Sequence, residues 1–145
     1  LGDQILDLGC GSGILSIICL KLGADHVMGT DIDPICMEAC RENMRRNQIE
    51  QTKYHFYCGD LISDPKIKDM ISVKEYDIVV ANILADIIIP MAPVVYPYLK
   101  KGGYFITSGI IDFKENPVKD ASIEAGFEII ETNYQGEWVS ITVRK

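Results

Sequence analysis

Basic residues and long uninterrupted hydrophobic runs are both scarce in this chain. Lys and Arg total 14 of 145 residues against 21 Asp and Glu, which gives a formal net charge of −7. A protein that binds nucleic acid through the phosphate backbone needs a basic face, so this balance argues against that class without forbidding a local basic patch. The longest mostly apolar stretch, residues 83–99, contains Asp86 and three prolines. It falls short of the roughly 20 apolar residues of a membrane helix, so we expect a soluble protein with no membrane association and no direct nucleic-acid binding.

Histidine and cysteine are also used sparingly. The two histidines are His26 and His55, and the five cysteines are Cys10, Cys19, Cys36, Cys40 and Cys58. An odd number of cysteines at irregular spacing does not indicate a disulfide framework, so we expect reduced thiols and a cytoplasmic protein. Cys36 and Cys40 would share a helix face, which leaves a metal pair conceivable, but the histidines are poorly spaced to complete it. Buried structural cysteines are the better interpretation, and we expect no metal.

The composition that remains is that of one soluble domain. Hydrophobic residues make up 48% of the chain and charged residues 24%, and no repeat, linker or low-complexity segment interrupts it. A domain of this length buries enough surface to hold a core without disulfides or metal.

Short apolar runs alternate with amphipathic stretches along the sequence. The pattern predicts strands at residues 5–8, 26–30, 54–58, 76–81, 104–108, 127–133 and 138–143. It predicts helices at 13–22, 33–47, 64–73 and 112–125, and a proline-broken helix after the fourth strand. Lys101-Gly102-Gly103 is expected to form a turn into the fifth strand, and residues 134–137 a hairpin connection. Five strand–helix units before a terminal hairpin predict a Rossmann-like, doubly wound α/β sheet of seven strands, with the last antiparallel and helices on both faces.

The candidate binding site lies at the carboxyl ends of the strands, where such sheets bind ligands. The first strand runs into Gly9-Cys10-Gly11-Ser12-Gly13, and Asp31 ends the second strand 22 positions after Gly9. A glycine loop followed at about this distance by an acid that grips ribose hydroxyls indicates a nucleoside cofactor. The alternative is a purely structural turn with a helix-capping Asp, although Asp33 is the better candidate for the cap.

The loop does not have the pattern of a dinucleotide site. The third glycine of G-x-G-x-x-G is replaced by Ile14, and no phosphate-binding G-x-x-x-x-G-K motif occurs. The loop reads G-x-G-x-G after the acid Asp7, which resembles the S-adenosylmethionine-dependent methyltransferases. The terminal hairpin is similar to theirs as well. Asp7 is a candidate acid near the methionine moiety, and a buried strand Asp held by loop N–H groups is compatible with that role.

Two further positions follow from this resemblance. Asp60 ends the third strand, where an acid in that superfamily approaches the adenine amino group, and a plain turn Asp is the alternative. Asn82 ends the fourth strand, which borders the methyl group. The chain lacks the Pro-Pro-aromatic sequence that follows this Asn or Asp in enzymes acting on planar amino groups.

The chain resembles the ribosomal protein L11 methyltransferases of the PrmA type over nearly its whole length. The segments that carry the resemblance are residues 5–15, 29–34, 80–86, 108–110 and 136–139. The resemblance implies transfer of methyl groups from S-adenosylmethionine to lysine side-chain and α-amino nitrogens of a ribosomal protein, with S-adenosylhomocysteine as product. It implies cofactor contacts by Gly9, Gly11, Asp31, Asp60 and Asn82, and it identifies no catalytic side chain.

The family pattern also includes an N-terminal substrate-recognition domain that these residues do not contain. We therefore interpret residues 1–145 as the S-adenosylmethionine-dependent methyltransferase domain alone. A methyltransferase for RNA or a small molecule, and a non-catalytic nucleotide-binding Rossmann module, remain alternatives. The oligomeric state is open.

Overall fold

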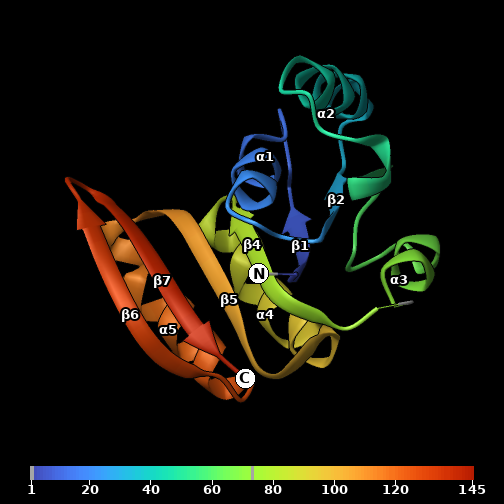
Figure 1. Ribbon diagram of the computed structural model, residues 1–145. Coiled ribbons are helices and arrows are strands. Elements are labelled where there is room, and N and C mark those ends of the chain that lie inside the picture. Colours follow the sequence, from blue (N-terminus) through green and yellow to red (C-terminus); the bar gives the residue numbers. More distant parts are fainter. Residues whose placement is uncertain (1, 73) are drawn as a thin grey trace.

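The strands form one mixed sheet with the order β3-β2-β1-β4-β5-β7-β6. The computed structural model describes residues 2–72 and 74–145. Its strands are β1 Gln4–Leu8, β2 His26–Asp31, β3 Tyr54–Cys58, β4 Tyr76–Asn82, β5 Leu99–Ile111, β6 Glu128–Gln135 and β7 Trp138–Arg144. Strands β1 to β5 pair in parallel, whereas β7 runs antiparallel to both β5 and β6. The predicted doubly wound α/β fold, with seven strands and an antiparallel end, is confirmed (Figure 1).

Helices cover both faces of the sheet. Helices α1 (Ile14–Lys21) and α2 (Pro34–Arg46) lie on one face, and α3 (Pro65–Ile71), α4 (Ala85–Val95) and α5 (Glu115–Glu124) on the other. Alternation along β1 sets this division, because Ile5 packs with the α1 side while Leu6 and Leu8 pack with the α4 side. Three 3₁₀ turns complete the described elements, at Gln51–Lys53, Tyr96–Tyr98 and Asp112–Lys114. Among the described helices, none is long and apolar enough to cross a membrane.

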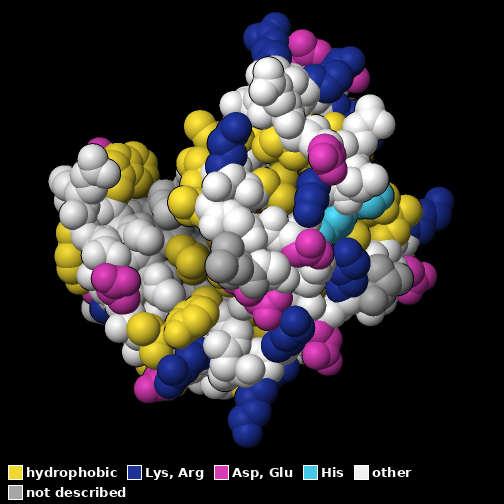
Figure 2. All heavy atoms as spheres, in the orientation of Figure 1, with side chains coloured by type: hydrophobic (Ala, Val, Ile, Leu, Met, Phe, Trp, Pro, Cys, Tyr) yellow, Lys and Arg dark blue, Asp and Glu magenta, His cyan; other side chains and the backbone are white. Residues whose placement is uncertain are grey.

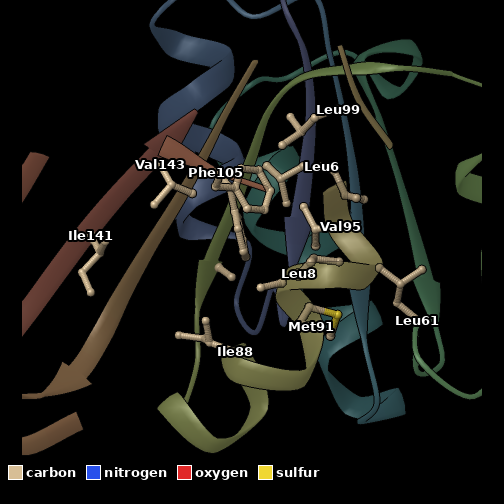
Figure 3. Close-up of a cluster of buried hydrophobic side chains, with 14 of the residues drawn as sticks. Leu6, Leu8, Leu61, Ile88, Met91, Val95, Leu99, Phe105, Ile141 and Val143 are labelled. Carbon is tan, nitrogen blue, oxygen red and sulfur yellow. The ribbon is translucent and has the colours of Figure 1, made fainter. Parts of the chain in front are cut away.

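The larger hydrophobic core lies between the sheet and α4. Figure 3 shows Ile88, Met91 and Val95 of α4 in the cluster of buried side chains that also contains Leu8 and Phe105 of the sheet. Helix α4 is therefore anchored along its length, and the position of its N-terminal end relative to β1 is fixed by packing.

Two helices start at the predicted positions, and each start is an Asp followed by a Pro. The side chain of Asp33 accepts a hydrogen bond from the Ile35 N–H at 3.0 Å, and that of Asp64 accepts one from the Lys66 N–H at 2.9 Å. Each carboxylate satisfies a backbone donor that the first helical turn leaves free, and the proline after it has no donor to lose. The predicted end of the second of these helices, Val73, lies outside the described residues.

Two sequence predictions about the chain after β4 are wrong. The expected proline-broken helix is one continuous helix, α4, with Pro90 and Pro93 inside it. Both prolines are on the exposed side, so the carbonyl groups that lose a helical partner face water. The expected Lys101–Gly103 turn is part of β5 instead. Lys145 keeps that segment paired, since its N–H donates to the Gly103 carbonyl and its own carbonyl accepts from Gly102, each at 2.9 Å.

The surface differs between the two helices on the α1 side. Figure 2 shows charged side chains of both signs over α2, at the top of the view, and hydrophobic side chains over α1. On α1, Ile14, Ile18 and Leu22 follow at intervals of four residues and are 61%, 46% and 78% exposed. Helix α1 is therefore apolar on its outer side as well as on the side that packs on the sheet.

Candidate functional site

A cavity of about 460 Å³ opens at the carboxyl ends of the strands, where the chain connections diverge from β1 toward β2 on one side and β4 on the other. Its walls come from the ends of β1, β2 and β3, the loop after β4 and the first turns of α4. The lining residues are Leu8, Gly9, Thr30, Asp31, Ile32, Gly59, Asp60, Leu61, Ile62, Ile83, Asp86, Ile87, Pro90 and Met91. The cavity thus lies where the sequence analysis placed a ligand.

The ionisable side chains among these described lining residues are all carboxylates, namely Asp31, Asp60 and Asp86. Apolar side chains from the loops after β2, β3 and β4 and from α4 make up most of the remaining wall. Carboxylates next to low-dielectric walls create a negative potential, so the cavity favours a cationic ligand that also has an apolar or aromatic part.

Asp31 is held in place by two backbone donors. Its Oδ2 accepts from the Gly11 N–H and its Oδ1 from the Asp33 N–H, each at 2.9 Å. These bonds tie the acid at the end of β2 to the glycine loop after β1, a contact that the sequence did not predict. A carboxylate oxygen can accept more than one hydrogen bond, so both oxygens can still bind hydroxyl groups in the cavity.

The glycine loop depends on backbone conformations that favour glycine. Gly9, Gly11 and Gly13 have φ values of +67°, +55° and +85°. At Gly9 a Cβ would also overlap the Cγ2 atom of Ile83, which lines the opposite wall of the cavity. Gly9 therefore serves both the tight turn and the close approach between the loop and the chain after β4.

Asp7 lies behind the loop, on the face of β1 that α1 covers. It is 1% exposed, and its Oδ2 accepts a hydrogen bond from the Ser16 hydroxyl at 2.6 Å. Its other oxygen is buried without a partner among the described residues. Burial raises the pKa of Asp7 to about 6, against the lowering effect of the Ser16 bond. The expectation that loop N–H groups would satisfy a buried Asp7 is wrong, because Ser16 of α1 reaches the carboxylate instead.

Asp60 has a local structural role and also lines the cavity. Its carboxylate accepts from the Ile62 N–H at 3.0 Å and from the Ser63 hydroxyl at 3.1 Å, which closes the turn after β3. The turn role expected as the alternative is therefore confirmed, and the turn holds Asp60 at the cavity wall. The contact with the adenine amino group stays a prediction.

The α4 end of the cavity has one accessible carboxylate. Asp86 lies in the first turn of α4, its side chain is 75% exposed, and its Oδ1 is 3.2 Å from the Nζ of Lys114. Ile87, Pro90 and Met91 continue the wall behind it. This end can therefore receive a lysine-like group, with an apolar surface for the stem and a carboxylate for the ammonium.

The other two predicted residues lie beside the cavity. Gly11 contributes its N–H to Asp31 but is not among the described lining residues, and neither is Asn82. Asn82 is exposed at the end of β4, next to Gly109 of β5, where a Cβ would lie 2.5 Å from its Oδ1. Three of the five predicted positions, Gly9, Asp31 and Asp60, thus come together around one cavity.

Comparison with known proteins identifies the family. A family model described as ribosomal protein L11 methyltransferase (PrmA) matches residues 1–145. The chain belongs to this family. The resemblance inferred from the sequence segments is therefore confirmed.

Individual relatives of the PrmA family agree with this assignment. A ribosomal protein L11 methyltransferase of Agathobacter rectalis is 60% identical over 141 residues, which are 97% of this chain and 44% of the relative. The crystal structure of a ribosomal protein L11 methylase from Lactobacillus delbrueckii subsp. bulgaricus superimposes with a TM-score of 0.88 at 32% identity, covering 100% of this chain and 71% of that one. The chain spans about half the length of the curated relatives it matches.

A more distant structure shares the fold. A TehB-like SAM-dependent methyltransferase from Corynebacterium glutamicum has a TM-score of 0.76 at 22% identity, covering 99% of this chain and 80% of that one. At this identity the likeness concerns the fold alone.

The apolar wall of the cavity in this PrmA-family chain was not predicted from the sequence. Ile32 follows Asp31 directly and is 72% exposed, and Leu61, Ile62, Ile87 and Met91 come from two other elements. Its position directly after the acid that ends β2 was the one sequence feature that could have placed Ile32 in the cavity wall. The rest of the wall depends on how α4 packs over β1 and β4, which no local pattern shows.

Proposed function

We propose that this chain is the catalytic domain of an S-adenosylmethionine-dependent methyltransferase that modifies lysine side-chain and α-amino nitrogens of ribosomal protein L11. The observation that carries the proposal is the acidic cavity in which Asp31, bonded to Gly11, faces the wall formed by α4. Membership of the PrmA family supports the choice of substrate, since relatives that share 60% and 48% identity with this chain are named for it.

The residues around the cavity fit the cofactor part by part. Asp31 would accept hydrogen bonds from the ribose hydroxyls, and Ile32, Leu61 and Ile62 offer apolar surface to the adenine ring. Asp60 lies on the same wall and can accept from the adenine amino group. The glycine loop, with no side chain at Gly9 and Gly11, lets the methionine part approach the backbone.

Charge complements this fit. The methionine part of the cofactor carries an ammonium and a sulfonium, and the described ionisable lining consists of carboxylates. The buried Asp7 adds a further acid behind the loop. A dinucleotide, with its anionic pyrophosphate, would be repelled by the same arrangement.

The α4 end of the cavity would receive the acceptor amine. Asp86 is accessible enough to attract an incoming lysine ammonium. The Nζ of Lys114 lies 3.2 Å from the Asp86 carboxylate, so this carboxylate already pairs with a lysine of the chain itself. Past Asp86, the side chains of Ile87 and Met91 would strip water from the amine. Because desolvation disfavours the charged form, the amine pKa falls from its usual value near 10.4 as it moves inward.

The bound cofactor supplies an electrophilic methyl group, and the protein supplies alignment. The chain would hold the nucleoside through Asp31 and orient the acceptor along α4, so that the amine faces the methyl carbon. Holding two reactants in line can contribute about 7–11 kcal/mol to lowering a barrier, so no covalent catalysis by the protein is required. We assign no general base, and proton loss to water suffices for this scheme.

The overall charge suits a basic protein as partner. The chain has a net charge of −7, and its described α2 surface carries charges of both signs rather than a basic stripe. Such a surface attracts a basic ribosomal protein and not the phosphate backbone of RNA. We expect the reaction to take place in the cytoplasm, where ribosomal proteins are made.

The test is transfer of a labelled methyl group by the full-length protein. Purified protein is incubated with tritiated S-adenosylmethionine and either free ribosomal protein L11 or ribosomal RNA, with Asp31→Ala as the control for dependence on the proposed site. We expect label in L11 alone, on lysine and α-amino nitrogens, and a large loss with the variant. Label in RNA alone, or in a small molecule alone, would reject the substrate. Binding without any transfer would favour a non-catalytic nucleotide-binding module.

A further inference from the structure

Two free thiols lie in contact directly behind the glycine loop. The Sγ atoms of Cys10, in the loop, and Cys40, in the middle of α2, are 3.6 Å apart. Cys10 is 6% exposed and Cys40 is fully buried, in a small cluster with Met37, Met44 and Phe56. The distance is that of two sulfur atoms in van der Waals contact, so these are reduced cysteines that already face each other.

The same thiols are linked to the candidate cofactor site through one residue, Gly11. The Cys40 Sγ donates to the Gly11 carbonyl at 3.1 Å, and the Gly11 N–H donates to Oδ2 of Asp31 at 2.9 Å. The position of Gly11 therefore depends on Cys40 on one side and supports Asp31 on the other. A chemical change at Cys40 can therefore shift Gly11 and, through the Gly11 N–H, the carboxylate of Asp31, which we assign to the ribose.

We propose that Cys10 and Cys40 form a reversible disulfide when the protein meets a peroxide, and that this bond weakens cofactor binding. One sulfur, as its thiolate, attacks a peroxide oxygen and becomes a sulfenic acid, while the O–O bond breaks and the first water leaves with the thiol proton. The second sulfur then attacks the sulfenic sulfur and displaces the second water. Two thiols and one hydrogen peroxide thus give one disulfide and two waters, and two electrons pass from sulfur to oxygen.

The local backbone allows the two sulfurs to approach. A disulfide bond is about 2.0 Å long, so the sulfur atoms must move about 1.6 Å closer than they lie here. Cys40 is fixed within the regular α2 helix, whereas Cys10 lies between Gly9 and Gly11, which are the most adaptable residues for such a shift. The movement therefore falls on the loop that lines the cavity.

The consequence for the site follows from the hydrogen bonds. A disulfide has no S–H, so the bond from Cys40 to the Gly11 carbonyl is lost. The displaced loop also moves the Gly11 N–H away from Asp31. Both changes disturb the wall that Gly9 and Asp31 form, so the oxidised protein binds a nucleoside cofactor more weakly.

The experiment is peptide mapping of the full-length protein after treatment with hydrogen peroxide. Trypsin cuts after Lys21 and Arg41, so Cys10 and Cys40 fall in separate peptides, and Cys19 shares the first of these and Cys36 the second. Fragment-ion mass spectrometry without reductant identifies which pair is joined. We expect a Cys10–Cys40 cross-link, at least a tenfold higher Kd for S-adenosylhomocysteine by calorimetry, and recovery of both with dithiothreitol.

Serine variants separate this bond from other oxidation. Cys40→Ser and, independently, Cys10→Ser should give no cross-link and should keep their own Kd after peroxide. Cys58→Ser removes the exposed thiol and should change nothing in the response. The proposal is overturned if peroxide joins another pair, if the cross-link forms without raising the Kd, or if Cys58→Ser abolishes the effect. Because binding and peptide mapping need no methyl acceptor, a wrong substrate assignment would not affect the result.

Discussion

The hydroxyl of Ser16 donates to the carboxylate of Asp7 at 2.6 Å, joining α1 to β1 beneath the glycine loop. Asp7 is 1% exposed, and its Oδ1 has no hydrogen-bond partner among the described residues. Burial outweighs the Ser16 bond and raises the pKa of Asp7 from 3.8 to about 6. Because the folded protein holds this proton more tightly than the unfolded chain, stability is lost as the pH rises from about 3.8 to about 6.

Asp7→Asn should remove this loss. A shift of this size corresponds to about 3 kcal/mol, which the ionised Asp7 costs the folded state above pH 6. We expect the free energy of unfolding of the variant, relative to wild type, to grow by about that amount between pH 4 and pH 7. Urea denaturation at several pH values measures it, with Ser12→Ala, an exposed change in the loop, as control. A difference independent of pH would mean that Asp7 does not titrate in this range.

The titration of His26 should change the stability of the protein in the opposite direction, over nearly the same pH range. It is buried, its Nε2 lies 2.7 Å from Nδ1 of His55, and its Nδ1 has no partner among the described atoms. Burial first, and then the charges of Lys74 and His55, lower its pKa from 6.5 to about 4. This group's contribution to stability is fully present above about pH 6.5 and is lost as the pH falls to about 4.

Nuclear magnetic resonance can follow both imidazoles, since the chain has two histidines. We expect one signal to stay neutral until about pH 4, and His55→Gln identifies it by elimination. A His26 signal that titrates near 6.5 would show that His26 is solvated. The opposite slopes of Asp7 and His26 also predict a nearly flat stability profile for wild type between pH 4 and 6, and a rising one for Asp7→Asn.

Gly9→Ala should damage the site more than an equivalent change elsewhere. The new Cβ would overlap Ile83 at the cavity wall, and the residue would keep a φ of +67°. Gly136→Ala is the matched control, because its φ is +60° and nothing lies within 4 Å of the added Cβ. Both variants should lose about 1–2 kcal/mol of stability from the strained backbone, but Gly9→Ala alone should bind S-adenosylhomocysteine at least tenfold more weakly. Equal Kd values for the two variants would show that Gly9 does not contribute to cofactor binding.

Asp86→Asn should weaken binding of the proposed acceptor protein and leave binding of the cofactor unchanged. A unit charge near a solvated ammonium contributes about 1 kcal/mol, so we expect a roughly fivefold higher KM for ribosomal protein L11. The Kd of S-adenosylhomocysteine should stay unchanged. Asp112→Asn, at an exposed position outside the described cavity lining, is the control. A higher Kd with an unchanged KM would assign Asp86 to the cofactor and not to the acceptor.

The sequence predicted the parts of the site that depend on short segments. The strand periodicity, the cap of α2 at Asp33, the start of a helix at Asp64, and the placement of Gly9 and Asp31 at the carboxyl ends of the strands follow from local rules, and the structure agrees. The uninterrupted α4 did not follow, because helix propensity disfavours Pro90 and Pro93 while packing of Ile88 and Val95 on the sheet holds the helix together.

Long-range packing also explains the remaining differences. Lys101–Gly103 stays in β5 because Lys145, more than 40 residues away, pairs with it. Ser16 replaces the loop N–H groups at Asp7 because α1 lies directly over β1. Lys145 comes from the far end of the chain and Ser16 from the next element, and in both cases packing between elements brings the two partners together.

The measurement that tests the central claim most directly is calorimetric titration of the full-length protein with S-adenosylhomocysteine and, separately, with NAD. Asp31→Ala removes the carboxylate assigned to the ribose, and Asp33→Ser keeps the cap of α2 and serves as control. We predict tight binding of S-adenosylhomocysteine by wild type and by Asp33→Ser, a loss of about 1.5–3 kcal/mol with Asp31→Ala, as for hydrogen bonds to a charged group, and weak binding of NAD. Tighter binding of NAD, or an Asp31→Ala variant that binds S-adenosylhomocysteine as well as wild type, would contradict the assignment of this cavity.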